Sequence, residues 1–329
     1  MTAPPRHNIA DLAARIKAGD RVALARGISL VESGDPEGLA LSEAVFTDAG
    51  RAHIVGITGP PGAGKSTLAD ALVRTYRARD LTVAVLAVDP VSPRTGGATL
   101  GDRIRMTAAS ADRGVFIRSS AARGQHGGLG LTTMQAARLM DVAGYDRIII
   151  ETVGTGQDGV TISTVAATIV LVQTPNSGDD VQALKAGILE LADVYVVNKA
   201  ELPGAEAMIE DLREVAEAAN QADQWSRPVV ATTAADGNGV PALVEAIEAH
   251  RAYLQASPDG EQRQAVRLWA EVQALVHNEV RVAVDRYLTA PATMHAAVPA
   301  LIAGRTNPLK MARSLLTARG WMPTPRDTP

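Results

Sequence analysis

The chain has 329 residues, 46% of them hydrophobic, and its 32 lysines and arginines against 36 aspartates and glutamates give a formal net charge of −4. This length and apolar content suffice for one large α/β domain with helical additions, and the charge balance gives no reason to expect nucleic acid or an anionic membrane as a partner. Cysteine is absent, which excludes disulfides and thiolate metal sites. No apolar run follows residues 1–8, and the longest apolar stretch, around 168–172, is too short to cross a bilayer. We therefore expect a cytoplasmic protein without a signal peptide or a membrane span.

Residues 8–50 are predicted to be helical and to form an N-terminal extension over residues 1–50. Asn8 and Asp20 are suitable N-caps, and each precedes apolar residues at helical spacing. These residues are Ile9, Leu12 and Ile16 after the first cap, and Leu24, Ile28 and Val31 after the second.

From 51 to 256, short apolar runs alternate with amphipathic helical patterns, and this region is predicted to be one nucleotide-binding domain. Apolar runs that lack a polar face indicate strands buried on both sides, and helices between them indicate parallel crossovers. We therefore predict an α/β fold with a mainly parallel, doubly wound sheet. Its strands are expected at 53–58, 82–88, 114–118, 147–151, 168–174, 194–198 and 228–232.

A complete phosphate-binding motif, G-x-x-x-x-G-K-[ST], follows the first predicted strand and leads into a predicted helix. In that context, backbone N–H groups of the loop and the helix N-terminus face a polyphosphate. Lys65 would neutralise the β- and γ-phosphates, and Ser66 would ligate Mg²⁺. The motif predicts a P-loop protein that binds a nucleoside triphosphate through Gly59, Pro60, Pro61, Gly62, Ala63, Gly64, Lys65, Ser66 and Thr67.

Three acidic residues are candidates for the metal and for the attacking water. Glu151 ends a predicted strand and is followed by Gly154, whose N–H would approach the γ-phosphate. Asp89 ends the second predicted strand, at the edge of the sheet where ligands gather. Asp102 lies beyond a glycine pair and would suit a helix N-cap equally well. With Lys65, these acids are the predicted catalytic residues.

The segment Asn198-Lys199-Ala200-Glu201 is predicted to select guanine. A carboxylate accepts hydrogen bonds from N1–H and from the exocyclic amine of guanine, which adenine does not offer. The acid here is Glu201, one methylene longer than the usual aspartate, so its reach differs. Backbone N–H groups of Thr233 and Ala234, after the next strand, are expected to meet guanine O6.

The residue after Gly154, where Ras-like GTPases carry their hydrolytic glutamine, is Thr155, and Gln157 comes two positions later. Without a positioned glutamine, we expect slow intrinsic hydrolysis.

After residue 256 the predicted strands stop, and residues 257–321 are expected to form a C-terminal helical region. A helix capped by Ser257 or Asp259 is predicted over 259–288. A shorter helix, entered at Asn307-Pro308, is predicted over 307–318. The tail, 322–329, is expected to be disordered. The long helix carries apolar residues at steps of three and four: Val266, Trp269, Val272, Val276, Val280, Val284 and Tyr287.

Together these motifs resemble the MeaB/ArgK family, the G-protein chaperones of adenosylcobalamin-dependent acyl-CoA mutases. The resemblance covers most of residues 8–256 and is looser toward the C-terminus. Several of its motifs lie outside the general GTPase set. Besides the phosphate loop, the matching segments are Val88-Asp-Pro90, Arg94-Thr-Gly-Gly97, Leu100-Gly-Asp102, Arg105-Met106, Glu151-Thr-Val-Gly154, Gly156-Gln157, Gly178-Asp-Asp180 with Gln182 and Lys185, and Asn198-Lys199.

The resemblance implies a GTPase that uses GTP, GDP and Mg²⁺. Ser66, Asp89, Asp102 and Glu151 would form its metal and water network. It also implies that GTP gates cofactor loading or protects a mutase, without indicating which mutase. Gln157 and the segment 178–185 would be switches that relay nucleotide state to the mutase. The polar switch residues of that segment are Asp179, Asp180, Gln182 and Lys185, which would equally suit a solvated helix start.

The resemblance further implies a homodimer through the C-terminal helices, although the long helix would equally suit packing on its own nucleotide-binding domain. Glu201 and Asp158-Gly159 depart from the family pattern. Two alternatives stay open. A metal-insertion GTPase would need a Cys- or His-rich cargo site, and the chain has no cysteine and six scattered histidines. A P-loop kinase of a small molecule or transport protein would need an acceptor site, and none is identifiable.

Overall fold

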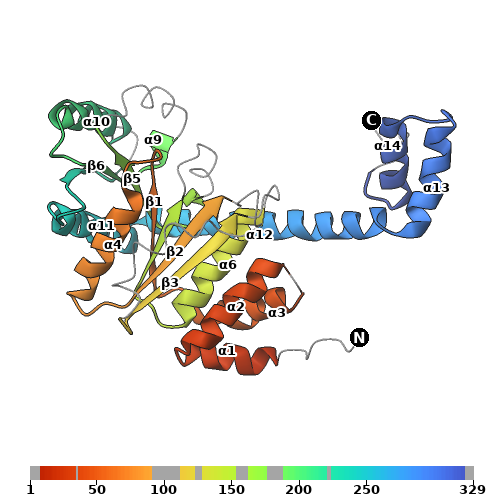
Figure 1. Cartoon of the computed structure of the whole chain (residues 1–329), viewed down its shortest axis with the longest axis horizontal. Coiled ribbons are helices and arrows are strands. Elements are labelled where there is room, and N and C mark those ends of the chain that lie inside the picture. Colours follow the sequence, from red (N-terminus) through yellow and green to blue (C-terminus); the bar gives the residue numbers. More distant parts are fainter. Residues whose placement is uncertain are drawn as a thin grey trace. The chain divides into compact units, whose positions relative to one another are not determined.

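A sheet of seven parallel strands carries the fold, in the order β3-β2-β4-β1-β5-β6-β7 (Figure 1). The structure is a computed structural model that describes residues 8–34, 36–90, 112–122, 128–152, 162–175, 188–220 and 224–322. The predicted parallel α/β fold is confirmed. The strands are β1 His53–Thr58, β2 Val83–Pro90, β3 Val115–Ala122, β4 Arg147–Thr152, β5 Thr168–Gln173, β6 Val194–Asn198 and β7 Val229–Thr232.

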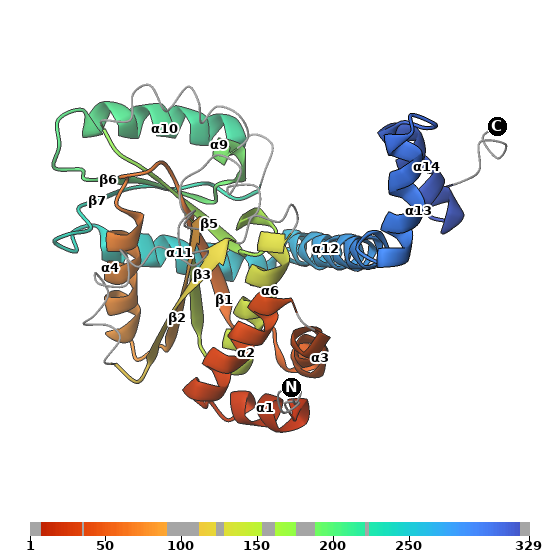
Figure 2. The same cartoon turned by 45° about the vertical axis from the view of Figure 1, so that its right-hand side comes forward.

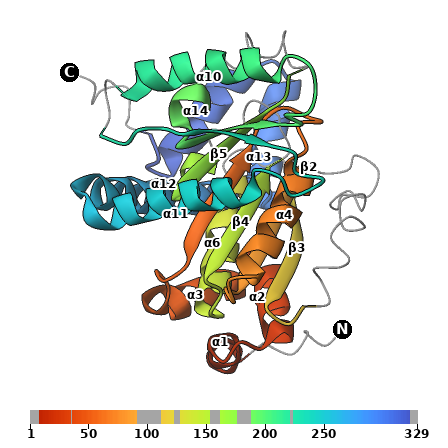
Figure 3. The same ribbon diagram turned by 90° about the vertical axis from the view of Figure 1, so that its left-hand side faces the viewer.

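Helices cover both faces of this sheet because its strands are apolar on both sides. Along β5, Val170 and Val172 join the core under α4 Lys65–Arg77 and α11 Val240–Ala256, whereas Leu171 joins the core under α10 Ala205–Asn220. That alternation follows from the two-residue period of a strand. Figures 1 and 3 show α4 and α11 together on one face, and Figure 2 shows α10 beside β6 and β7. The short helix α9 Ile188–Leu191 precedes β6.

Three N-terminal helices share a core with the sheet through α6 Gly128–Val142. They are α1 Ile9–Lys17, α2 Arg21–Ser33 and α3 Pro36–Val45, followed by a 3₁₀ turn at Phe46–Asp48. The predicted caps are confirmed: the Asn8 side chain accepts from the Asp11 N–H, and the Asp20 side chain accepts from two N–H groups of the first turn. The fully buried side chains that join these helices to α6 include Ile16, Leu24, Ile28, Leu41 and Leu139.

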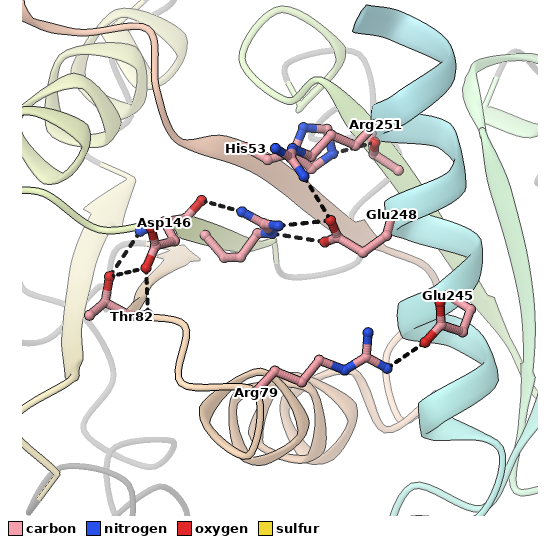
Figure 4. A network of polar contacts seen from close by, with 9 residues as sticks. His53, Arg79, Thr82, Asp146, Glu245, Glu248 and Arg251 are labelled. Carbon is pink, nitrogen blue, oxygen red and sulfur yellow. Dashed lines mark hydrogen bonds and ion pairs between the residues drawn. The ribbon is translucent and has the colours of Figure 1, made fainter.

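At the edge of the sheet where the strands begin, α11 is attached by ion pairs. Arg147, at the start of β4, donates from Nε and Nη2 to the two carboxylate oxygens of Glu248 at 2.8 and 2.7 Å. Arg251 donates to the same carboxylate at 3.1 Å. Figure 4 shows Glu248 and Glu245 on this helix, with Glu245 paired to Arg79 at 2.7 Å. The bidentate pair fixes α11 against the sheet.

A buried chain of polar side chains continues along the same edge. His53 Nε2 lies 2.8 Å from Thr168 Oγ1, which lies 2.8 Å from His250 Nδ1. His250 Nε2 lies 3.4 Å from Asp193 Oδ1. Burial, followed by the charge of Arg147, lowers the pKa of the His53 imidazole to about 3, so that ring is neutral at physiological pH. This row of polar side chains connects β1, β5, α11 and the residue before β6.

Asp193 also holds the first turns of α12 Pro258–Leu288. Its Oδ1 accepts from Arg263 Nη1 at 2.7 Å, and its Oδ2 accepts from the Ile169 N–H at 2.8 Å. The Asp193 side chain is 2% exposed, and burial raises the pKa of its carboxyl group against the opposing effect of Arg263. Further along α12, Glu271 receives two hydrogen bonds from Arg138 of α6, both at 2.6 Å. The beginning of α12 is therefore attached to both β6 and α6.

The chain divides into two compact units, Met1–Ala274 and Leu275–Pro329, and the division falls within α12. The predicted helix 259–288 agrees with α12, and Ser257 caps the C-terminus of α11. The helix predicted over 307–318 is confirmed as α14 Pro308–Ala318, capped by the Asn307 side chain. Disorder is predicted for residues 322–329, and residues 323–329 lie outside the described part of the chain.

One helix of the second unit, α13 Pro291–Ile302, was not predicted. Its sequence carries no charged residue, and Pro299 lies inside it. An amphipathic pattern needs polar residues on one face, and an internal proline normally argues against a helix. The sequence therefore lacks the amphipathic pattern of a helix and contains a residue that normally interrupts one.

Candidate nucleotide site

The phosphate loop joins β1 to α4 and packs directly on the ends of two neighbouring strands. Gly59 has φ +143°, and a Cβ there would lie 2.1 Å from the Val172 carbonyl oxygen of β5. Gly64 has φ +85°, and a Cβ there would lie 2.4 Å from Asn198 Nδ2 at the end of β6. Only glycine satisfies both the positive φ and the close approach at these positions. The motif therefore fixes where the loop sits on the sheet.

Lys65 is the first residue of α4, and it is buried with its ammonium group inside the loop. Its Nζ donates to the carbonyl oxygens of Gly59 and Pro60, both at 2.9 Å. The first turn of α4 adds N–H groups that have no partner within the helix and a favourable field for anions. The loop thus places a cation and a helix N-terminus together, as a polyphosphate site requires.

Ser66 and Glu151 meet beside this loop. Glu151 lies one residue before the end of β4, in register with Ile57 of β1, and Ser66 Oγ donates to Glu151 Oε1 at 2.5 Å. A hydroxyl and a carboxylate are oxygen ligands of the kind that Mg²⁺ prefers. The residues present fit a Mg²⁺ ion bound at this end of α4. Ser66 and Glu151, two predicted metal ligands, are 85 positions apart in the sequence and are in contact in the structure.

The remaining predicted metal and switch residues are only partly described. Asp89 follows Val88, which pairs with Thr152 of β4, so its backbone lies at the same edge of the sheet as Glu151. The side chain of Asp89 lies outside the described residues. The following predicted residues also lie outside the described residues: Asp102, Gly154, Gln157, Asp179, Asp180, Gln182 and Lys185.

Asn198 and Lys199 connect the base-recognition segment to the phosphate loop. Asn198 Nδ2 donates to the Ala63 carbonyl oxygen at 2.8 Å, and Lys199 Nζ donates to the Gly62 carbonyl oxygen at 2.9 Å. Asn198 Oδ1 accepts from the Thr232 hydroxyl at 3.1 Å. This contact of Thr232 was not predicted, although its position at the end of the strand next to β6 is the signal that could have indicated it.

Glu201 lies near the end of β7, where the Thr233 hydroxyl donates to its Oε2 at 2.8 Å. The N–H of Thr233 donates to the Asn238 carbonyl oxygen at 3.0 Å, and the N–H of Ala234 donates to Asn198 Oδ1 at 3.1 Å. Both N–H groups therefore have acceptors within the chain. The expected contact with guanine O6 stays a prediction, and it would need the Ala234 N–H to leave or share its Asn198 acceptor.

Two general features bear on the alternative functions. Across the described residues, His, Asp and Glu side chains form no group of three or more that could hold a metal ion. A cargo site for metal insertion is thus not found in that part of the chain. Among the helices that the structure describes, none combines the length and the apolar content needed to cross a membrane.

Comparisons with known proteins agree with this site. The family model of the methylmalonyl-CoA mutase-associated GTPase MeaB matches residues 24–288. A putative GTPase of Pyrococcus horikoshii is 44% identical over 284 residues, which cover 85% of this chain and 90% of the relative. GTPase ArgK of Escherichia coli is 34% identical over 295 residues, covering 85% and 88% of the two chains.

A mitochondrial methylmalonic aciduria type A homolog of Mus musculus is 32% identical over 257 residues, covering 73% of this chain and 62% of the relative. The crystal structure of an LAO/AO transport system kinase has the same fold, with a TM-score of 0.68 and 24% identity over 97% of this chain and all of that one. The family match includes the phosphate loop, Glu151 and Asn198-Lys199. The chain belongs to the MeaB family of P-loop GTPases.

Proposed function

We propose that this GTPase is a chaperone of an adenosylcobalamin-dependent acyl-CoA mutase, and that it gates cofactor loading or protects the mutase in the cytoplasm. The observation that carries the proposal is the match of residues 24–288 to a family model described as mutase-associated. The mouse relative, named for methylmalonic aciduria, supports the same connection.

In the proposed reaction, the chain's own residues bind and orient the nucleotide. Lys65 would neutralise the β- and γ-phosphates, Ser66 and Glu151 would hold Mg²⁺, and Asp89 and Asp102 would complete the network. When bound, Mg²⁺ neutralises phosphate charge. Asn198 and Lys199 hold the loop through Ala63 and Gly62, and Glu201 accepts from guanine.

GTP binding and hydrolysis would act as a timer for the mutase. The candidate switch 178–185 follows β5, whose Val172 carbonyl lies against Gly59 of the phosphate loop. Gln157 and the segment 178–185, with Asp179, Asp180, Gln182 and Lys185, would take one of two conformations according to the bound nucleotide. A mutase that binds one conformation better would then respond to hydrolysis.

The test is hydrolysis of GTP and ATP by the full chain, with and without candidate B12-dependent mutases at matched concentration. We expect slow GTP turnover alone and a marked increase with one mutase, since no positioned glutamine is predicted for the isolated protein. Turnover unchanged by every mutase, or a preference for ATP, would contradict the proposal. Transfer of phosphate to an acceptor other than water would indicate the kinase alternative.

We also propose a homodimer that uses the apolar side chains at the beginning of α12. Val266 is 63% exposed and Trp269 is 62% exposed, so neither side chain is covered within the first unit. Such exposed apolar side chains, three residues apart on one helix, are typical of a helix that packs against another chain.

Replacing both Val266 and Trp269 by lysine is expected to convert a dimer into a monomer, because the charges would be desolvated at the interface. Light scattering after size-exclusion chromatography measures the mass. Val22→Lys is the matched control, since Val22 is 73% exposed on α2. A wild-type monomer at all concentrations, or a dimer that the double variant leaves intact, would contradict this proposal.

A further inference from the structure

The middle of β1 contains a glycine that its own backbone conformation does not require. Gly56 has no positive φ, so an alanine could adopt the same backbone angles. Glycine weakens the interior of a strand because it loses more conformational entropy on folding and has no side chain to pack. A glycine at such a position often marks a place where another part of the chain approaches closely.

The turn over residues 162–166 is the part of the chain that approaches Gly56. A Cβ at Gly56 would lie 2.5 Å from Ile162 Cγ1, 2.6 Å from Ile162 Cδ1 and 2.8 Å from Ala166 Cβ. All three distances are below 3.0 Å, so these atoms would have to move apart. Ile162 and Ala166 are both buried, and a closely packed interior leaves them little space in which to move.

Backbone hydrogen bonds hold the same turn against β1. The Ala166 N–H donates to the Ile162 carbonyl oxygen at 2.8 Å and closes the turn. The next N–H, that of Ala167, donates to the Ile54 carbonyl oxygen of β1 at 2.9 Å. Ile162 and Ala166 also belong to one small apolar cluster, against which Ile54 packs. The missing side chain of Gly56 therefore allows the turn to pack directly on β1.

The segment that precedes this turn is attached to β1 on both of its sides. Thr152 and Ile162 are the described residues on either side of 153–161. Thr152 Oγ1 donates to the Ile57 carbonyl oxygen at 3.4 Å. Ile162 packs on Gly56, the residue before Ile57. The two attachment points of the segment are thus adjacent residues of β1, the strand that leads directly into the phosphate loop.

We propose that Gly56 and Ile162 are positioning residues for GTP hydrolysis: their close contact fixes the end of segment 153–161 relative to the phosphate loop. Gly154, the predicted γ-phosphate contact, and Gln157, a predicted switch residue, belong to this segment. A larger residue at position 56 would push the turn away from β1 and displace that end of the segment. Neither positioning residue touches the nucleotide. The inference rests on the GTP reaction proposed above.

The experiment measures single-turnover GTP hydrolysis and the dissociation constants of GDP and of a non-hydrolysable GTP analogue for the full chain. Gly56→Ala is expected to slow hydrolysis about 10-fold, because small displacements of reacting groups are costly. It should weaken binding of the analogue about 5- to 10-fold, the loss of one hydrogen bond. GDP binding should stay close to that of the wild type, because GDP has no γ-phosphate.

The matched control is Gly27→Ala, which also adds one methyl group to a buried and closely packed position. A Cβ at Gly27 of α2 would lie 2.8 Å from Ile16 Cδ1, within the core of the N-terminal helices. Its effect should be confined to stability, so hydrolysis and both dissociation constants should match those of the wild type.

A double-mutant cycle with Ile162→Ala separates positioning from loss of stability. Ile162→Ala removes the two atoms closest to the added methyl group, so the double variant should hydrolyse GTP faster than Gly56→Ala does. Ile162→Ala alone leaves the turn with less contact on β1 and should also lower the affinity for the analogue relative to GDP. That single variant tests the inference if circular dichroism shows that Gly56→Ala does not fold.

Three results would overturn the inference alone: equal losses of GDP and analogue binding, a double variant no faster than Gly56→Ala, or wild-type hydrolysis by a folded Gly56→Ala variant. A wild-type chain that neither binds nor hydrolyses GTP would overturn the proposed reaction as well.

Discussion

Replacing Lys65 by methionine is expected to lower kcat for GTP hydrolysis roughly 10²- to 10³-fold, the loss typical of removing one preorganised electrostatic contact to a transition state. Lys65 is the buried cation of the phosphate loop, and its Nζ is held 2.9 Å from two loop carbonyl oxygens. Methionine keeps an unbranched apolar stem in the same space but offers no charge to the transferring phosphate. Single-turnover hydrolysis at saturating GTP measures the effect.

A matched control distinguishes loss of catalysis from loss of structure. Lys17→Met removes an exposed lysine that pairs with Asp48 on the surface, and kcat should stay within twofold of the wild type because an exposed ion pair contributes about 0–1 kcal/mol. Circular dichroism should show both variants folded. Turnover of the Lys65 variant close to that of the wild type would contradict the assignment of the phosphate site.

Replacing Asp193 by alanine is expected to lower the free energy of unfolding by about 3–5 kcal/mol, the cost of breaking a buried charge pair by removing one partner. The carboxylate is 2% exposed and accepts from Arg263 and from the Ile169 N–H. Its loss would leave the Ile169 N–H without this acceptor and would remove a buried carboxylate from Arg263, which also pairs with Asp259 at 2.9 Å. Urea denaturation monitored by circular dichroism measures the change.

The control for this prediction is Glu245→Ala, which removes a carboxylate that is 70% exposed and paired with Arg79. That change should alter the free energy of unfolding by about 0–1 kcal/mol. If the two alanine variants proved equally stable, Asp193 would not be the structural centre that its contacts indicate. Nucleotide affinity should be unchanged in both, because neither side chain lies at the phosphate edge of the sheet.

The strands were predictable because each is a contiguous apolar run whose burial on both faces leaves a clear pattern. The phosphate loop was predictable because it is one continuous sequence motif. The motif itself supplies glycine at the positions that have positive φ, such as Gly59 and Gly64. The meeting of Ser66 with Glu151 followed from parallel topology, since both lie at the carboxyl edge of adjacent strands. Local motifs and the topology rule together predict where the candidate site lies.

What the sequence did not indicate depends on contacts between distant segments. Asp193, His250 and Arg263 come from three different segments, and no spacing rule relates them. The Thr233 hydroxyl was overlooked because its contact with Glu201 depends on how two loops lie side by side. Helix α13 was missed for another reason: Thr293 and His295 are its only polar side chains, so it lacks the polar face that periodicity requires.

The hydrogen-bonded chain of His53, Thr168 and His250 has a consequence for the protons it contains. A threonine hydroxyl carries a single proton, so Thr168 can donate to one imidazole and must accept from the other. Asp193 next to His250 Nε2 favours a proton on that nitrogen, which leaves Nδ1 to accept from Thr168. His53 must then carry its proton on Nε2. One carboxylate thereby determines the tautomers of two histidines, and the order of donors runs in one direction from β1 to Asp193.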